Sequence, residues 1–195
     1  MKPSGDGGNK DRAMKRRMAV LGVVLALGAA RMAAQETYPL HPDPMDGIWQ
    51  GYDAEWRHVS NQLVALAEAT PAEKFAWRPA PGVRSTSEVY MHIAMANFYL
   101  LSVTGPPMPP DLKGDAEKTV TSKAEVIAWL KRSLEAVKRA HAAEAATDLA
   151  RAVKAGGRDS TVDAMYLRII IHANEHMGQL VAYARMTGVV PPWSK

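Results

Sequence analysis

Apolar side chains recur at steps of three and four residues in four separate stretches of this chain, and that spacing constrains the fold more than any other feature. It places side chains on one face of a helix, whereas a half-buried strand alternates at every second residue. The stripes predict one helix over residues 44–69, a second over 86–103, a third that begins after Ser122, and a fourth over 161–187. We find no alternating strand pattern of useful length, so the sequence predicts an all-α fold.

Local signals place the ends of these helices. A Ser followed three residues later by an acidic residue is typical of a helix N-terminus, because each side chain binds a free backbone N–H of the first turn. Three such pairs precede predicted helices: Ser85 with Glu88, Ser122 with Glu125, and Ser160 with Asp163. Residues 104–121 form a long connection. Thr147 and Asp148 are expected to open a short extra helix, which ends at a turn formed by Gly156 and Gly157.

The N-terminus has the order of an export signal. Lys15, Arg16 and Arg17 precede an apolar run over residues 18–30, and small residues follow it. Thirteen apolar residues suit the core of a signal peptide better than a membrane span. We therefore expect a signal peptide over 1–34, an extended lead-in over 35–44, and a folded domain over 45–193. The protein would be periplasmic or secreted, with no stable membrane anchoring after cleavage; the alternative is an uncleaved anchor helix.

Charge and cysteine content exclude several classes of function. Residues 1–34 carry seven basic and two acidic side chains, whereas the rest of the chain carries 17 basic and 18 acidic ones, a net charge of −1. A nucleic-acid-binding domain carries its basic surface on the folded part, so we expect no nucleic-acid partner. The chain has no cysteine, which excludes a disulfide scaffold, a cysteine-ligated zinc site and a thiol nucleophile.

Three histidines form the candidate metal site. His172 and His176 are four residues apart on the apolar face of the fourth predicted helix, and His92 lies on the apolar stripe of the second. Buried imidazoles without partners are costly, and a divalent metal accepts the nitrogen lone pair of each neutral ring. The alternative is that these histidines have separate packing roles. His141, alone on its stripe, is expected to be a hydrogen-bonded core residue.

Two further side chains lie near the histidine pair. Glu175 completes an H-x-x-E-H sequence typical of one class of zinc protease, in which the glutamate is the general base. That class needs another ligand downstream, and none of the 19 residues after His176 is Asp, Glu or His. Glu175 is therefore either a base or ligand-orienting group near the metal, or a surface carboxylate. Gln179 is expected to hydrogen-bond a metal ligand.

Two sequence segments resemble the DinB/YfiT-like family. The first covers the loop from Trp77 to Ser85 and the following Val89 to His92, and the second runs from His172 to Pro192 with the pattern H-x₃-H-x-G-Q-L. The resemblance covers roughly residues 45–193. It implies a four-helix bundle with up-down-down-up topology, a three-histidine site that often holds nickel or zinc, and frequently a homodimer.

Three functions follow as hypotheses. The first is a metal-dependent enzyme, either a hydrolase or a thiol-transferase-like protein, acting on an unidentified small molecule. The resemblance implies the thiol chemistry, but the export signal argues against a cytoplasmic thiol as the substrate. The second is a metal-binding or ligand-sensing protein without turnover. The third is a structural bundle in which the histidines only pack. Bound metal separates the first two hypotheses from the third.

Overall fold

The computed structural model describes residues 51–194, which are mostly helical. The predicted signal peptide, the lead-in and the start of the domain lie outside the described residues, as does His41. The helices are α2 (Tyr52–Ala69), α3 (Thr86–Thr104), α4 (Ala116–Thr119), α5 (Lys123–Ala143) and α6 (Val162–Met186). Two 3-10 turns, η1 (Ala72–Lys74) and η2 (Pro192–Ser194), and two strands, β1 (Ala152–Ala155) and β2 (Arg158–Thr161), complete the fold.

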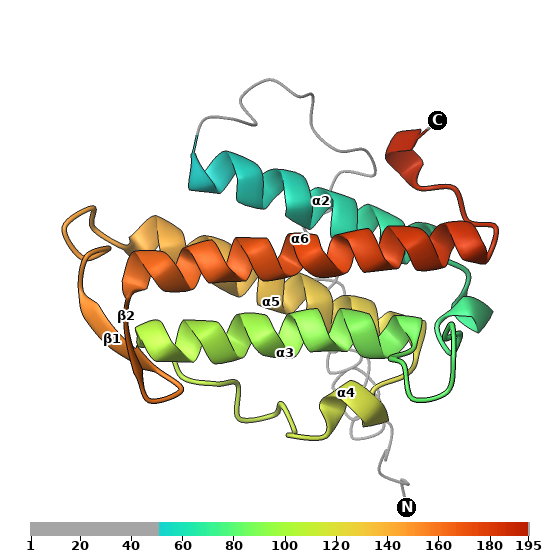
Figure 1. The fold of residues 1–195 in the computed structure, drawn as a ribbon, viewed down its shortest axis with the longest axis horizontal. Coiled ribbons are helices and arrows are strands. Elements are labelled where there is room, and N and C mark those ends of the chain that lie inside the picture. The colour runs from blue at the N-terminus through green and yellow to red at the C-terminus, as the bar shows by residue number, and fades with distance from the viewer. Residues whose placement is uncertain (1–50, 195) are drawn as a thin grey trace, which may run out of the picture. The chain divides into compact units, whose positions relative to one another are not determined.

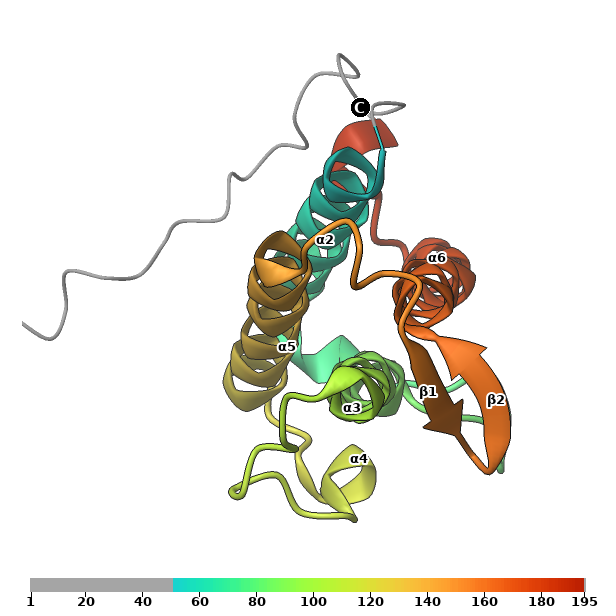
Figure 2. The same ribbon diagram turned by 90° about the vertical axis from the view of Figure 1, so that its left-hand side faces the viewer.

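The long helices lie side by side, and each packs against two others. α3 contacts α5 and α6, and α2 contacts the same two helices. Viewed end on, α2, α3, α5 and α6 surround a common interior (Figure 2). α2 and α6 run in one direction, whereas α3 and α5 run in the other (Figure 1). The parallel neighbours α3 and α5 require the long connection between them, and α4 lies within that connection and packs against α3.

The first helix begins later than predicted. Gly51 precedes α2 with a φ of 99°, so the expected continuous helix over 44–69 is wrong at this position. Glycine adopts positive φ readily because it has no Cβ, and a residue in that conformation interrupts the helical backbone. The apolar spacing from Trp49 to Tyr52 continues across the interruption, which explains why the stripe alone did not show it.

The second correction concerns the short helix expected to begin at Thr147 and Asp148. Residues 146–150 form a turn instead, and residues 152–161 form a β-hairpin. β1 pairs with β2 in antiparallel register, with Ala152 opposite Thr161. Gly156 and Gly157 have φ values of 55° and 78°, and a two-residue hairpin turn of this kind requires positive φ at both positions. The glycine pair is thus a turn, as predicted, but it joins strands. The expected all-α fold is correct only as a mostly helical one.

The other long helices begin at the predicted N-terminal caps, except that one cap is shifted by one residue. Ser85 and Glu88 form the complete capping box of α3, and the Ser122 hydroxyl accepts the backbone N–H of Glu125 at the start of α5. At α6 the N-cap is Thr161, whose hydroxyl accepts the N–H of Ala164, and not Ser160 as predicted. β2 continues through Thr161, so the helix can begin only at the next residue.

The interior between the helices is largely apolar, and two of its buried hydrogen bonds join different helices. Trp56 donates its indole N–H to the backbone carbonyl of Leu134, joining α2 to α5 over 3.1 Å. Asn97 donates to the Ser133 hydroxyl over 3.2 Å, joining α3 to α5. Within residues 51–194, no helix combines the length and apolar character that crossing a membrane requires.

Candidate metal centre

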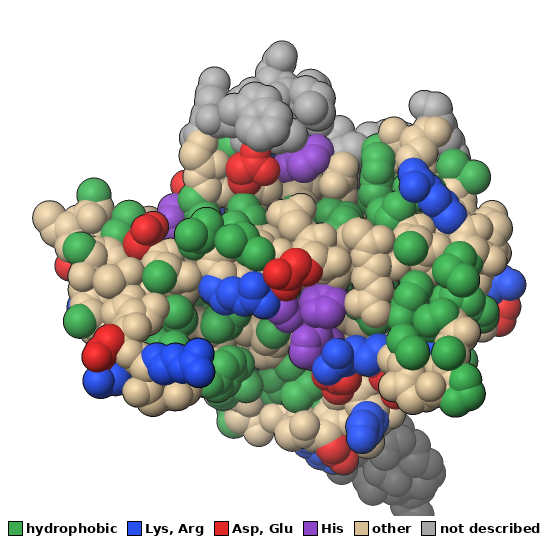
Figure 3. Space-filling view, viewed as in Figure 1, with side chains coloured by type: hydrophobic (Ala, Val, Ile, Leu, Met, Phe, Trp, Pro, Cys, Tyr) green, Lys and Arg blue, Asp and Glu red, His purple; other side chains and the backbone are tan. Residues whose placement is uncertain are grey.

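The structure brings His92, His172 and His176 together between α3 and α6. The ring centroids lie 4.5–5.0 Å apart, and one nitrogen from each ring lies within 4.8 Å of the others. His92 and His176 are half-buried, whereas His172 is buried. Histidine side chains are visible at the centre of the face shown in Figure 3, with charged side chains on either side of them. Among the described residues, these three histidines form a group whose ligand atoms could hold one metal ion.

The spacing of the ring nitrogens fits a metal ion. The Nε2 atoms of His92 and His172 are 3.2 Å apart. With metal–nitrogen distances of about 2.0–2.1 Å, two such nitrogens subtend an angle of about 100° at the ion, between the octahedral and tetrahedral values. The same separation suits a hydrogen bond between the two rings when no ion is present. The group as a whole spans up to 4.8 Å, and two nitrogens bound to one ion at these distances lie at most about 4.2 Å apart. The residues present therefore fit a divalent cation after a small movement of the side chains.

His92 is oriented by a carboxylate from the long connection. Its Nδ1 donates to Glu117 Oε2 of α4 over 2.8 Å, and the other carboxylate oxygen accepts from Arg84 Nε over 2.6 Å. Burial acts to raise the pKa of Glu117, but the bonds from Arg84 and His92 lower it below its usual value. The carboxylate therefore stays ionised and holds a proton on Nδ1 of His92, which leaves the Nε2 lone pair directed toward the other rings.

His176 is oriented by a second chain of hydrogen bonds. Its Nδ1 contacts Gln179 Oε1 over 2.8 Å, and Gln179 Nε2 donates to the Tyr183 hydroxyl over 2.8 Å. Tyr183 in turn donates to the backbone carbonyl of Arg84 over 3.2 Å. The structure thus places Gln179 in hydrogen-bond contact with His176.

His172 has no such support. It is 8% exposed, and its Nδ1 is buried without a hydrogen-bond partner among the described residues. Burial and then the proximity of His176 and His92 lower the pKa of His172 to about 4. Burial also lowers the pKa of His92. Both rings are therefore neutral near pH 7, the state in which imidazole binds metal.

Glu175 lies on the exposed face of α6 in an ion pair. Both of its carboxylate oxygens accept from Arg168, over 3.2 and 3.0 Å. The hydrogen bond from Arg168 lowers the pKa of Glu175, which makes the carboxylate a weaker base. In this structure Glu175 is a paired surface carboxylate.

The other histidines lie apart from the triad. His141 Nδ1 contacts Asp53 Oδ1 over 2.7 Å, and its ring packs on Tyr52 at 4.1 Å. This confirms the expected hydrogen bond, although the ring lies at the end of α5 and is only half-buried. His58 is also half-buried and belongs to no ligand group among residues 51–194.

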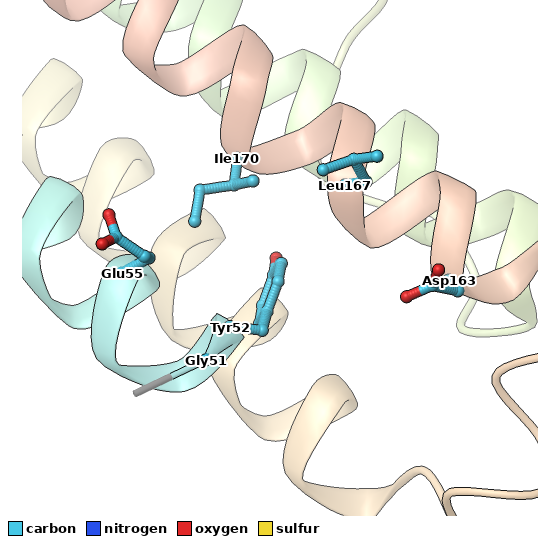
Figure 4. A pocket seen from close by; sticks show the side chains of 6 residues that line it. All are labelled: Gly51, Tyr52, Glu55, Asp163, Leu167 and Ile170. Atoms are coloured by element: carbon cyan, nitrogen blue, oxygen red, sulfur yellow. The ribbon is translucent and has the colours of Figure 1, made fainter. Parts of the chain in front are cut away.

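A shallow pocket of about 380 Å³ lies between α2 and α6 and contains none of the triad. Tyr52 and Glu55 of α2 and Asp163, Leu167 and Ile170 of α6 line it, with Gly51 at its edge (Figure 4). The two triad histidines of α6 thus face α3, and the pocket lies on the side of α6 that faces α2.

Sequence reasoning missed Glu117, Arg84 and Tyr183. Arg84 and Tyr183 lie within the family-like segments but received no role, because nothing in the spacing showed that they would meet. Glu117 lies 25 residues after His92 on a helix of four residues, and one acidic residue in a polar connection carries no signal.

Comparisons with known proteins agree with this architecture. The sequence model described as "DinB superfamily" matches residues 55–180, more than half of the chain. A DinB-like protein from Bacillus cereus matches with a TM-score of 0.65 and 23% identity, covering 74% of this chain and 95% of its own. A DinB-like protein from Bacillus subtilis matches with a TM-score of 0.60 and 19% identity, covering 74% and 97%. These likenesses show the fold. No curated protein matches the chain.

Proposed function

The chain belongs to the DinB superfamily, and on that premise we propose that it is an exported protein that holds a divalent metal ion at His92, His172 and His176. The observation that carries the proposal is the convergence of three imidazole nitrogens within 4.8 Å of one another. Two of the rings have their Nδ1 atoms occupied by Glu117 and Gln179, which directs Nε2 toward the common point. Zinc and nickel suit such an imidazole site.

We propose that the site is catalytic and acts on a small molecule as a hydrolase or a thiol-transferase-like enzyme. Three protein ligands leave a coordination position open, which is typical of catalytic sites, whereas structural zinc sites have four. A bound divalent ion supplies Lewis acidity and lowers the pKa of a coordinated water or thiol. Arg84 and Glu117 orient His92, while Gln179 orients His176 and keeps the proton of that ring on Nδ1. Glu175 can accept a proton only after its bonds to Arg168 break.

Metal handling or ligand sensing without turnover is the second candidate. The triad and its supporting hydrogen bonds serve it equally well. The pairing of Glu175 with Arg168 favours it, because that pairing lowers the pKa of Glu175 and makes the carboxylate a weaker base.

The proposed architecture is a four-helix bundle of α2, α3, α5 and α6 with up-down-down-up topology. It is supported by the packing of α3 and α2 against both α5 and α6. A homodimer is part of the proposal on the family resemblance alone.

The test of metal binding uses the chain purified without a histidine tag. We expect about one equivalent of zinc or nickel by elemental analysis after loading and desalting at pH 7.5. His176→Ala should lose most of this metal, because it removes one of the three ring nitrogens that would bind the ion. His58→Ala is the matched control and should retain it. Equal metal content in the wild type and His176→Ala would contradict the proposal.

The test of catalysis follows from the first. The metal-loaded chain is screened against hydrolysable esters and against electrophiles with an added thiol. An activity that disappears with a chelator and returns with the metal supports the enzyme. A chain that binds metal tightly and turns over none of these compounds supports the second candidate.

A further inference from the structure

Two hydrogen-bond chains leave the histidine triad and end at the same residue. One runs from His92 through Glu117 to the guanidinium of Arg84, and the other runs from His176 through Gln179 and Tyr183 to the backbone carbonyl of Arg84. We propose that Arg84 is a positioning residue that fixes the orientation and tautomer of two of the three candidate ligands. This inference rests on the proposed function, and it assigns to the loop before α3 the preorganisation of the site.

The first chain depends on the Arg84 side chain. A carboxylate only accepts hydrogen bonds, so Glu117 requires the proton of His92 on Nδ1. The Arg84 bond over 2.6 Å holds the Glu117 side chain in the position where it reaches His92. Glu117 belongs to the four-residue helix α4, which packs against α3. The bond from Arg84 adds a restraint on the Glu117 side chain itself.

The second chain depends on the Arg84 carbonyl. The donor and the acceptor of each of its hydrogen bonds can be assigned by starting from that carbonyl. A carbonyl only accepts, so the Tyr183 hydroxyl donates to it and must accept from the Gln179 amide group. The amide oxygen of Gln179 then faces His176, which places the proton of that ring on Nδ1. The Nε2 lone pair of His176 is therefore directed to the metal by a backbone group on another segment of the chain.

The loop that carries Arg84 is held firmly enough to act in this way. The backbone N–H groups of Thr86 and Ser87 donate to the carbonyls of Trp77 and Phe75, both over 2.9 Å. The capping box begins at Ser85, the residue that follows Arg84. The Arg84 carbonyl is thus fixed to the first turn of α3, the helix that also carries His92.

The experiment separates the two chains. Arg84→Ala removes the guanidinium, and Tyr183→Phe removes the hydroxyl while it keeps the ring that packs on Trp77 at 5.1 Å. The matched control is Arg132→Ala. Arg132 binds Asp111 of the same connection with a similar exposed fraction, 45% against 42% for Arg84, but its partner contacts no histidine. Glu117→Gln repeats the first test if Arg84→Ala does not fold.

Two measurements are made on each variant. Zinc and nickel affinities come from competition with a chromophoric chelator, and the tautomers of His92 and His176 come from ring ¹⁵N chemical shifts of the metal-free protein at pH 7.5. We expect Arg84→Ala and Tyr183→Phe each to weaken metal binding about 10-fold or more, as loss of a ligand-orienting partner does. In Arg84→Ala, the proton of the His92 ring should no longer be confined to Nδ1. In Tyr183→Phe, the same should hold for the proton of the His176 ring. Arg132→Ala should change neither affinity nor tautomers.

Failure of this inference differs from failure of the proposed function. If the wild type binds neither zinc nor nickel, the proposed function is wrong, while the metal-free tautomers still decide the role of Arg84. If the wild type binds metal and Arg84→Ala binds it equally well with unchanged ring shifts, the positioning role is refuted. An equal loss of affinity in Arg84→Ala and Arg132→Ala would also refute it, because tethering of the connection would then be the whole effect.

Discussion

The buried contact between Asn97 and Ser133 allows a prediction of stability that can be worked through from the structure. Both residues are fully buried, and the Asn97 amide N–H donates to the Ser133 hydroxyl over 3.2 Å. The amide oxygen of Asn97 has no hydrogen-bond partner among the described residues. Ser133→Ala would leave the whole Asn97 amide buried without a partner. We expect the free energy of unfolding to fall by about 1–3 kcal/mol, the cost of such a group.

The partner substitution should behave differently. Asn97→Leu removes the unsatisfied oxygen together with the donor, and the Ser133 hydroxyl keeps its bond to the Leu130 carbonyl over 2.8 Å. Replacing a buried polar group by an apolar one of similar size is close to neutral when no partner is left unpaired. We therefore expect the free energy of unfolding of Asn97→Leu to lie within about 1 kcal/mol of the wild type. In that background, Ser133→Ala should cost little.

Urea unfolding followed by circular dichroism measures all four proteins of this cycle at pH 7.5. With an m-value of about 2 kcal/mol/M, a loss of about 2 kcal/mol lowers the midpoint by about 1 M. The reasoning is refuted if Ser133→Ala costs the same with Asn97 present and with Leu in its place, because the orphaned amide would then contribute nothing.

Three other predictions follow from the site, the hairpin and the resemblance. The pKa of His172 is lowered to about 4 from an ordinary 6.5. The neutral His172 ring therefore makes its full contribution to the stability of the metal-free protein above pH 6.5, and this contribution is lost as the pH falls toward 4. Between pH 7.5 and 4.5, the urea midpoint should fall less steeply in His172→Phe than in the wild type. Gly156→Ala should cost about 1 kcal/mol, because φ is 55° and an added Cβ meets no atom within 4 Å, whereas Gly156→Asn should cost less; thermal unfolding compares the two. Light scattering at tens of micromolar should give the mass of a homodimer, and a monomer mass would contradict that expectation.

The long helices were predictable because their apolar stripes and N-terminal caps agree. Ser85 with Glu88 marks the start of α3, and the structure shows the same capping box. The spacing of four between His172 and His176 also predicts that both share one face of their helix, and the structure places both rings beside His92 of α3. Local spacing was sufficient for these features because both residues of each pair lie on one helix.

The features that sequence missed depend on contacts between distant segments or on backbone conformation. The hairpin strands are short and rich in small and polar residues, so they lack the alternation of a strand, although Gly156 and Gly157 gave the correct turn. Gly51 interrupts a stripe that continues across it. Glu117 meets His92 only because the connection folds back over α3, and no local pattern encodes that return.

The position of Glu117 on α4 has a consequence for how such a site can be altered. The connection between α3 and α5 is not one of the long packed helices, and connecting segments accept substitutions and length changes more readily than a core does. Changes at the exposed positions of residues 105–121 can therefore alter how firmly His92 is held while every histidine and every core side chain stays the same. For protein engineering, this segment allows the strength of metal binding to be graded in small steps, whereas exchange of a histidine removes a ligand outright.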